Sequence, residues 1–283
     1  MEALERITSS TNAKLKLAAK LHIPKYRKEN HLFVTEGIRL IEMAAAAQWP
    51  LSFALASDSV LKNQRAVEVI EQLQERNCPV YQVSDELYKK AADTVTPQGL
   101  LLVMGQRIFT WQEILNSSPD NAPLIAVLDG VQDPGNAGTI IRSADALGCS
   151  GVVCLDGTTD IFADKAVRSS MGSLFNLPIL DHVHVEEFLE ACRDNEVRIF
   201  ASALDEHAVR HYAVDYNSGS AIVFGNEGNG VSQHILEAAD QRVFIPMYGK
   251  AESLNVGAAA AIILYEACRQ RTIFYKTQKT SAC

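Results

Sequence analysis

The feature that most constrains the fold is a series of short apolar runs, each too short to form a helix. The clearest is 124–128 (LIAVL), and four similar runs follow it, at 151–155, 198–203, 221–224 and 242–245. Runs of this kind are typical of parallel strands that are covered on both faces. Helical segments are predicted between them, at 137–147, 164–170, 185–194, 232–239 and 253–271. This alternation predicts an α/β domain with a mostly parallel sheet.

Strands and helices are also predicted to alternate in the first part of the chain. Strands are predicted at 31–35, 52–56, 79–83 and 100–104, and helices at 12–21, 37–47 and 64–76. Asn12 and Thr11 are both candidates for the N-cap of the first helix. The stretch 107–122 is polar and turn-rich, which is typical of a linker. We therefore expect a smaller α/β domain at 1–106, a linker at 107–122 and a second domain at 123–283.

Composition excludes several other classes of protein. The 283 residues are 47% hydrophobic and 21% charged, close to an average globular protein. The N-terminus has no apolar stretch typical of a signal peptide, and the longest apolar run, 254–268, is shorter than the roughly 20 residues of a membrane span. The cysteines show no CxxC spacing, and His182 and His184 alternate as in a strand. These features predict a cytoplasmic protein with reduced thiols, no metal and no membrane association.

The net charge of −8 is unevenly distributed. Residues 1–39 hold eight basic and four acidic side chains, a local charge of +4, whereas residues 106–283 carry −9. A basic arm on an acidic protein is a candidate binding surface for a polyanion. A solvated helix face explains the same charges, so composition alone leaves the function open.

Three segments carry candidate chemistry, and each follows a predicted strand. In 128–142 a Pro/Gly turn leads into a helix that carries Asn136 and Arg142. Ligands bind at the carboxyl ends of strands in open α/β sheets. A helix cap at Asn136 and a surface role for Arg142 are the alternative interpretation.

The second and third segments, 224–232 and 245–257, are rich in small residues. Gly225 and Gly230 have the spacing of a phosphate loop, but Val231 stands where that loop requires lysine, which argues against a nucleoside triphosphate site. A glycine-rich hairpin turn remains open. Ser253 is the predicted N-cap of the last helix, whose N-terminus points backbone N–H groups at the preceding loop.

The order and the residue identities of these segments resemble those of the SpoU (TrmH-type) RNA ribose 2′-O-methyltransferases of the SPOUT superfamily. Asn136, Arg142 and Gly148 resemble the first family motif, 225–228 (GNEG) the second and 253–256 (SLNV) the third, and 168–173 (RSSMGS) matches the stretch between the first two. Gly257 departs from the family, where serine is common. The resemblance covers 123–270. Residues 7–104 resemble the family's substrate-binding domain through 7–9 (ITS), 33–37 (FVTEG) and 96–99 (TPQG).

This resemblance implies a catalytic domain with a trefoil knot, which is otherwise rare in proteins. It further implies a homodimer and S-adenosylmethionine as cofactor. The expected cofactor-binding residues are Leu204, Gly225, Ile245, Leu254 and Asn255. The expected catalytic residues are Arg142, Asn136, Glu227, Ser253 and Asn255. The expected RNA-binding residues, most of them in the basic arm, are Lys14, Lys16, Lys20, Lys25, Arg27, Lys28 and Arg168.

The implied reaction is methyl transfer to a ribose 2′-hydroxyl of RNA. The family assigns proton removal to the residue that matches Arg142, but a guanidinium does not readily lose its proton. A second role for Arg142, clamping an RNA phosphate and stabilising the developing alkoxide, stays open. Ribosomal RNA is the expected substrate and transfer RNA the alternative. A non-catalytic RNA-binding protein that keeps the fold is the rival hypothesis, and the complete set of motif residues argues against it.

Overall fold

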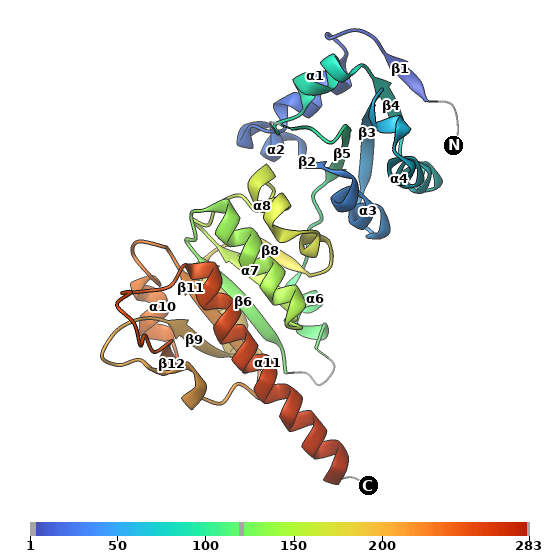
Figure 1. The fold of residues 1–283 in the computed structure, drawn as a ribbon. Coiled ribbons are helices and arrows are strands. Elements are labelled where there is room, and N and C mark those ends of the chain that lie inside the picture. Colours follow the sequence, from blue (N-terminus) through green and yellow to red (C-terminus); the bar gives the residue numbers. More distant parts are fainter. Residues whose placement is uncertain (1–3, 95, 119–121, 282–283) are drawn as a thin grey trace. The chain divides into compact units, whose positions relative to one another are not determined.

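The computed structural model describes residues 4–94, 96–118 and 122–281, with side chains as far as Thr272. The chain forms two compact units (Figure 1). The N-terminal unit comprises Met1–Arg107 and Asp160–Phe175, and the C-terminal unit comprises Ile108–Thr159 and Asn176–Cys283. Within the described residues, no helix has the length and apolar character needed to cross a membrane.

The N-terminal unit is built on a mixed five-stranded sheet with the order β1-β4-β3-β5-β2. Its strands are β1 (Glu5–Ile7), β2 (Leu32–Glu36), β3 (Leu51–Ser57), β4 (Val80–Val83) and β5 (Leu100–Gly105). Its helices are α1 (Ala13–Lys20), α2 (Pro24–Asn30), α3 (Ile38–Ala46), η1 (Val60–Lys62), α4 (Gln64–Glu75), α5 (Asp85–Ala91), α8 (Asp164–Ser170) and η2 (Ser173–Phe175). All four strands and three helices predicted for 1–105 are confirmed, and Asn12 rather than Thr11 caps α1. Strand β1 and helices α2 and α5 were not predicted, because they are too short to show a clear period.

The C-terminal unit contains a seven-stranded sheet with the order β10-β12-β9-β11-β6-β7-β8, in which every strand pair is parallel. Its strands are β6 (Leu124–Asp129), β7 (Gly151–Leu155), β8 (Ile179–Val183), β9 (Arg198–Ser202), β10 (Val209–Arg210), β11 (Ser220–Gly225) and β12 (Gln241–Phe244). Its helices are α6 (Trp111–Asn116), α7 (Pro134–Ala146), α9 (Val185–Asp194), η3 (His211–Ala213), α10 (Gln233–Ala238) and α11 (Val256–Ser281). The predicted α/β class and parallel sheet are confirmed.

Both faces of this sheet are covered, which explains the continuous apolar runs. β7 is buried along its whole length, and β6 is buried except at its last residue. Helices α7 and α11 pack against each other on one face, as Figure 1 shows, while α9 and α10 contact each other and β9. Burial on both faces removes the polar alternation that a one-sided strand shows.

The segment 160–175 lies between β7 and β8 in sequence but packs within the N-terminal unit. Phe162 and Phe175 join an aromatic cluster with Phe33 and Trp49, in which ring centroids lie 5.0–6.3 Å apart. The side chain of Asp160 binds the guanidinium of Arg27. The compact units therefore differ in this segment from the predicted division at 106 and 123.

The predicted linker 107–122 contains a helix, α6. Thr110 caps it, and Glu113 completes a reciprocal capping box. The indole Nε1 of Trp111 donates to Glu187 Oε1 over 2.9 Å, and Ile114 is fully buried. The stretch is therefore packed against α9 over this helix. The Thr-x-x-Glu signature was the available signal for it. Residues 119–121 of the predicted linker lie outside the described residues.

Five cysteines have described side chains, and all are free thiols. Burial raises the pKa of both Cys149 and Cys192 to about 12 and that of Cys78 to about 11. Cys283 lies outside the described residues. The expectation of reduced, mostly buried thiols is confirmed for the described cysteines.

Two partners that can only accept hydrogen bonds favour the charged form of His22. Its Nδ1 lies 3.0 Å from Asp164 Oδ2, and its Nε2 lies 2.7 Å from the carbonyl oxygen of Ala91. Burial alone would lower the pKa of His22, but these hydrogen bonds and the nearby charges of Asp164 and Asp93 raise it above its ordinary value of 6.5. The site therefore favours the imidazolium.

This geometry predicts a pH-dependent stability of the N-terminal unit. Because the folded-state pKa is raised, the contribution of His22 is complete below about pH 6.5 and is lost as the pH rises through the folded-state pKa. We expect the protection factors of the α8 amides, corrected for the intrinsic pH dependence of exchange, to fall over that pH range in the native protein and to stay constant in His22→Gln. One ring nitrogen of His22 and one oxygen each of Asp93 and Asp164 also lie within 4.8 Å of one another. A rise in Tm with Zn²⁺ that His22→Gln abolishes would contradict the proton-based account.

Candidate active site

Three side chains from the three motifs form one hydrogen-bonded chain. Asn136 Nδ2 donates to Glu227 Oε1 over 2.8 Å, and Asn255 Nδ2 donates to Asn136 Oδ1 over 2.9 Å. Asn136 lies in the first turn of α7, Glu227 in the loop after β11, and Asn255 directly before α11. Segments that are 91 and 119 residues apart are thus joined at the carboxyl ends of the strands.

The loop between β6 and α7, residues 130–133, contacts the second motif through its backbone. The N–H groups of Gln132 and Asp133 donate to the two carboxylate oxygens of Glu227, over 3.0 and 3.1 Å. Asp133 also accepts from the backbone N–H of Asn136 and is the N-cap of α7. The alternative that Asn136 is merely a helix cap is therefore wrong. Its side chain is instead free to join Glu227 to Asn255.

Glu227 is an ionised hydrogen-bond acceptor. Partial burial alone would raise its pKa, but the hydrogen bonds from the Asn136 side chain and from the N–H groups of Gln132 and Asp133 lower the pKa below its ordinary value. A carboxylate with a lowered pKa is a weak proton acceptor at neutral pH. Glu227 therefore serves to hold the first motif rather than to remove a proton.

The glycines after β11 allow one stretch of backbone to cross another. The backbones of Asn226 and Gly230 exchange two hydrogen bonds of 2.9 Å. A Cβ atom on Gly225 would lie 2.1 Å from the carbonyl carbon of Gly230, which no real contact permits. Any side chain at position 225 would therefore force the loop open. The interpretation of this stretch as a tight turn is confirmed, and the turn also lines a pocket.

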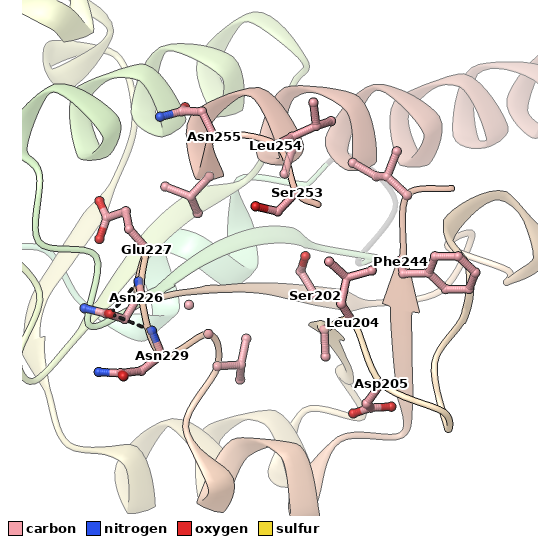
Figure 2. A pocket seen from close by; sticks show the side chains of 18 of the residues that line it. Ser202, Leu204, Asp205, Asn226, Glu227, Asn229, Phe244, Ser253, Leu254 and Asn255 are labelled. Carbon is pink, nitrogen blue, oxygen red and sulfur yellow. Dashed lines mark hydrogen bonds between the residues drawn. The ribbon is translucent and has the colours of Figure 1, made fainter. Parts of the chain in front are cut away.

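The pocket has a volume of about 690 Å³ and lies within the C-terminal unit. In Figure 2, Ser253, Leu254 and Asn255 lie along one side of it, Asn226, Glu227 and Asn229 along a second, and Ser202, Leu204, Asp205 and Phe244 along a third. Its lining includes the carboxylates of Asp205 and Glu227 but no lysine or arginine. An acidic, partly apolar pocket suits a ligand with a positive charge and without phosphates.

All five residues predicted to bind the cofactor line this pocket: Leu204, Gly225, Ile245, Leu254 and Asn255. Ser253 lines it as well, but it is not the N-cap of α11. That helix begins at Val256, and Asn255 Oδ1 accepts from the N–H groups of Gly257 and Ala258. The predicted cap at Ser253 is wrong, because Asn255 satisfies these N–H groups two residues later.

Arg142 lies outside the pocket lining, on the exposed side of α7. It makes no hydrogen bond or ion pair with another described residue. One helical turn before it, Thr139 packs closely on Gly257 of α11, where a Cβ atom would lie 3.0 Å from Thr139 Cγ2. The motif residues therefore form two groups, the bonded set Asn136, Glu227 and Asn255, and the solvent-facing Arg142.

Sequence reasoning missed several residues that shape the site. Asp205 lines the pocket and binds Arg242 Nη1 over 3.0 Å, and Asp129 accepts from the N–H of Ser232 over 2.7 Å. Both are isolated acidic residues, Asp129 at the end of β6 and Asp205 after β9, and neither has a recognisable spacing. Asp129 had one usable signal, its position at the carboxyl end of a buried strand.

The predicted RNA-binding side chains differ in exposure. Lys16, Lys20, Lys25 and Lys28 are exposed, whereas Lys14 is half-buried with its ammonium 4.8 Å from the ring centroid of Tyr81. Arg168 is 40% exposed and lies 4.0 Å from Asp93.

Arg27 is a correction to this set. Its side chain is only 3% exposed, and it binds Asp160 and the carbonyl oxygen of Leu21 over 2.7–2.8 Å. A guanidinium buried in these contacts cannot reach an RNA phosphate. It instead fixes the turn after α1 to the start of the segment 160–175.

Comparisons with known proteins find two matched regions, which fall within the predicted domains 1–106 and 123–283. A family model described as the SpoU rRNA methylase family matches residues 123–265, and one described as an MRM3-like substrate-binding domain matches residues 12–102. The chain is 32% identical over 265 residues to a 23S rRNA (guanosine(2553)-2′-O)-methyltransferase of Bacillus subtilis, covering 93% of this chain and 98% of that protein. It is also 32% identical to a 23S rRNA (uridine(2479)-2′-O)-methyltransferase of Streptomyces viridochromogenes, covering 95% and 93%.

Solved structures agree with these matches. An rRNA methyltransferase from Sinorhizobium meliloti with bound AdoMet superposes with a TM-score of 0.83 at 30% identity, covering 94% of this chain and 98% of that chain. The SpoU methyltransferase AviRb from Streptomyces viridochromogenes, in complex with AdoMet, superposes with a TM-score of 0.80 at 29% identity, covering 92% and 99%.

Proposed function

The chain belongs to the SpoU rRNA methylase family, and from this premise we propose that it methylates a ribose 2′-hydroxyl of ribosomal RNA with S-adenosylmethionine. The observation that carries the proposal is the bonded set of Asn136, Glu227 and Asn255 beside an acidic pocket. It joins all three motifs of the resemblance at one place. The ribosomal substrate follows from the relatives, which are named for 23S rRNA.

The pocket fits the proposed cofactor. S-adenosylmethionine is a sulfonium without phosphate groups, and it supplies an electrophilic methyl group when bound. The carboxylate of Glu227 complements a positive charge, and the side chains of Leu204, Ile245 and Leu254 supply apolar surface for an adenine ring. The absence of lysine and arginine from the lining disfavours nucleoside triphosphates.

The reaction requires the 2′-hydroxyl to lie in line with the methyl group and to lose its proton. Asn136, Glu227 and Asn255 position the motif loops around the methyl donor. We assign Arg142 to the RNA side, where its exposed guanidinium binds a phosphate and stabilises the developing alkoxide. Because a guanidinium keeps its proton in proteins, the phosphate or a water accepts the proton. Ser253 contacts cofactor or substrate at the pocket rim.

The remaining expectations extend this proposal. RNA is captured by the N-terminal unit through the exposed lysines of the basic arm. The C-terminal segment is threaded into the trefoil knot implied by the resemblance. The protein acts in the cytoplasm.

The direct test is to incubate the protein with S-adenosylmethionine and RNA and to analyse the digested nucleosides by mass spectrometry. We expect a 2′-O-methylated nucleoside from ribosomal RNA. Methylation of a base, or of transfer RNA only, would overturn the respective part of the proposal. Failure of the cofactor to bind in calorimetry would favour a non-catalytic RNA-binding protein. Mapping 2′-O-methyl sites in cells with and without the protein would identify the nucleotide.

We also propose that the protein is a homodimer that pairs through its C-terminal unit. Ile262 and Tyr265, which lie one helical turn apart on α11, are 39% and 60% exposed. Apolar side chains grouped in this way are typical of an interface. We expect a dimer by light scattering at micromolar concentration and a shift to monomer in Ile262→Glu. An active monomer in the native protein would contradict the pairing.

A further inference from the structure

The loop after β7, residues 156–159, lies outside the three motifs but contacts the β6–α7 loop closely. The side chain of Thr158 is almost fully buried, with the residue 9% exposed. Its hydroxyl donates to the carbonyl oxygen of Leu128 over 2.8 Å and accepts from the N–H of Gly130 over 3.2 Å. One hydroxyl therefore satisfies two backbone groups at the point where the chain leaves β6.

Two further contacts join the same loops. The N–H of Thr159 donates to the carbonyl oxygen of Val131 over 2.9 Å, and Gln132 Nε2 donates to the carbonyl oxygen of Gly157 over 2.5 Å. The β6–α7 loop is thus held by the 156–159 loop.

The β11–α10 loop holds it as well. Asn226 Nδ2 donates to the carbonyl oxygen of Gly130 over 3.0 Å, and Asp129 accepts from Ser232. The β6–α7 loop, from which α7 starts, is therefore held between the 156–159 loop and the β11–α10 loop.

We propose that Thr158 is a positioning residue for methyl transfer, and this inference rests on the proposed function. Its hydroxyl fixes the turn at Gly130, whose φ of +70° bends the chain toward α7. The next residues bind Glu227 and cap the helix that carries Asn136 and Arg142. Without the hydroxyl, the carbonyl oxygen of the buried Leu128 and the N–H of the half-buried Gly130 each lose a partner, and the loop relaxes to satisfy them elsewhere. A displacement of about 1 Å in a positioning group costs about 10²-fold in rate.

The test compares Thr158→Val, which keeps the shape but removes the hydroxyl, with Thr158→Ser, which keeps the hydroxyl. We expect Thr158→Val to lower kcat for RNA methylation by about 10-fold or more and Thr158→Ser to restore most of it. Cofactor affinity in calorimetry should change little, because neither the 156–159 loop nor the β6–α7 loop lines the pocket. Thr159→Val is the matched control, since the Thr159 side chain makes no hydrogen bond to a described residue while its N–H is retained.

A second readout separates this inference from the proposed function. Amide exchange at 128–133 should accelerate in Thr158→Val and remain native-like in Thr158→Ser. If the native protein does not methylate RNA, the proposed function fails, and the exchange data still decide whether the hydroxyl fixes the loop. An unchanged kcat in Thr158→Val, or equal losses of kcat and Tm in both variants, would overturn the positioning role.

Discussion

Replacing Arg142 with alanine should lower the rate of methyl transfer by at least ~10² and leave the affinity for S-adenosylmethionine nearly unchanged. The guanidinium is exposed on α7 and does not line the pocket. It also makes no ion pair with a described residue, so its removal leaves no unpaired carboxylate behind. The expected loss is therefore confined to the RNA side of the reaction. Single-turnover rates and calorimetry with the cofactor measure the two effects separately.

Arg142→Lys distinguishes two kinds of role. A lysine keeps the charge but cannot form the paired hydrogen bonds of a guanidinium to phosphate, so we expect little rescue. Arg193→Ala, which removes an exposed arginine from the end of α9, is the control and should behave like the native protein. A parallel loss of cofactor affinity in Arg142→Ala would move this residue into the cofactor site and refute the assignment.

Most of the strands had a local signal in the sequence, although β1, β8 and β10 were not predicted, and the pocket residues were predictable through the resemblance. Strands such as β6 and β7 are buried on both faces, and their unbroken apolar runs are short enough to exclude a helix. Gly225 and Asn255 lie in segments that resemble the second and third motifs of the SpoU family. This resemblance predicts that both residues lie in one cofactor site, although the sequence gives no distance between them. Both line the observed pocket.

Other features depend on tertiary partners and have no local signal. Arg27 resembles its basic neighbours in sequence, yet it is buried against Asp160, a residue 133 positions away. Asp133 and not Asn136 caps α7, and Asn255 and not Ser253 caps α11. Only the path of the backbone decides between such neighbouring candidates. Thr158 lies in no motif, and its importance appears only once β6 and β7 are seen side by side.

Removing the whole N-terminal domain is a poor test of RNA capture in this protein. The segment 160–175 packs within the N-terminal unit, where Phe162 and Phe175 are buried against Phe33 and Trp49. Deleting residues 1–105 would expose these rings in the remaining chain. A loss of RNA binding would then report misfolding as readily as a lost interface. Surface substitutions avoid this difficulty.

Neutralising Lys16, Lys20 and Lys28 together with glutamine should weaken RNA binding and flatten its salt dependence. All three are exposed, and none has an ion-pair partner among the described residues. Each phosphate contact contributes roughly 0.7–0.9 to the slope of log affinity against log salt, so we expect the slope to fall by roughly 2–3 if all three bind phosphates. The C-terminal half carries a charge of −9 and repels RNA at long range, which makes these contacts more important for capture.

The control removes positive charge from elsewhere on the N-terminal unit, by glutamine substitution of Lys62 and Lys89, which are also exposed and have no ion-pair partner among the described residues. A general electrostatic effect would lower the RNA affinity of both variants, whereas a defined surface at α1 and α2 affects only the first. Cofactor affinity and the dimer should persist in both, because the substitutions lie outside the C-terminal unit. If the first variant bound RNA with the native affinity and slope, the basic arm would be only a solvated surface. The acidic catalytic unit would then have to capture RNA by itself, through exposed side chains such as Arg142.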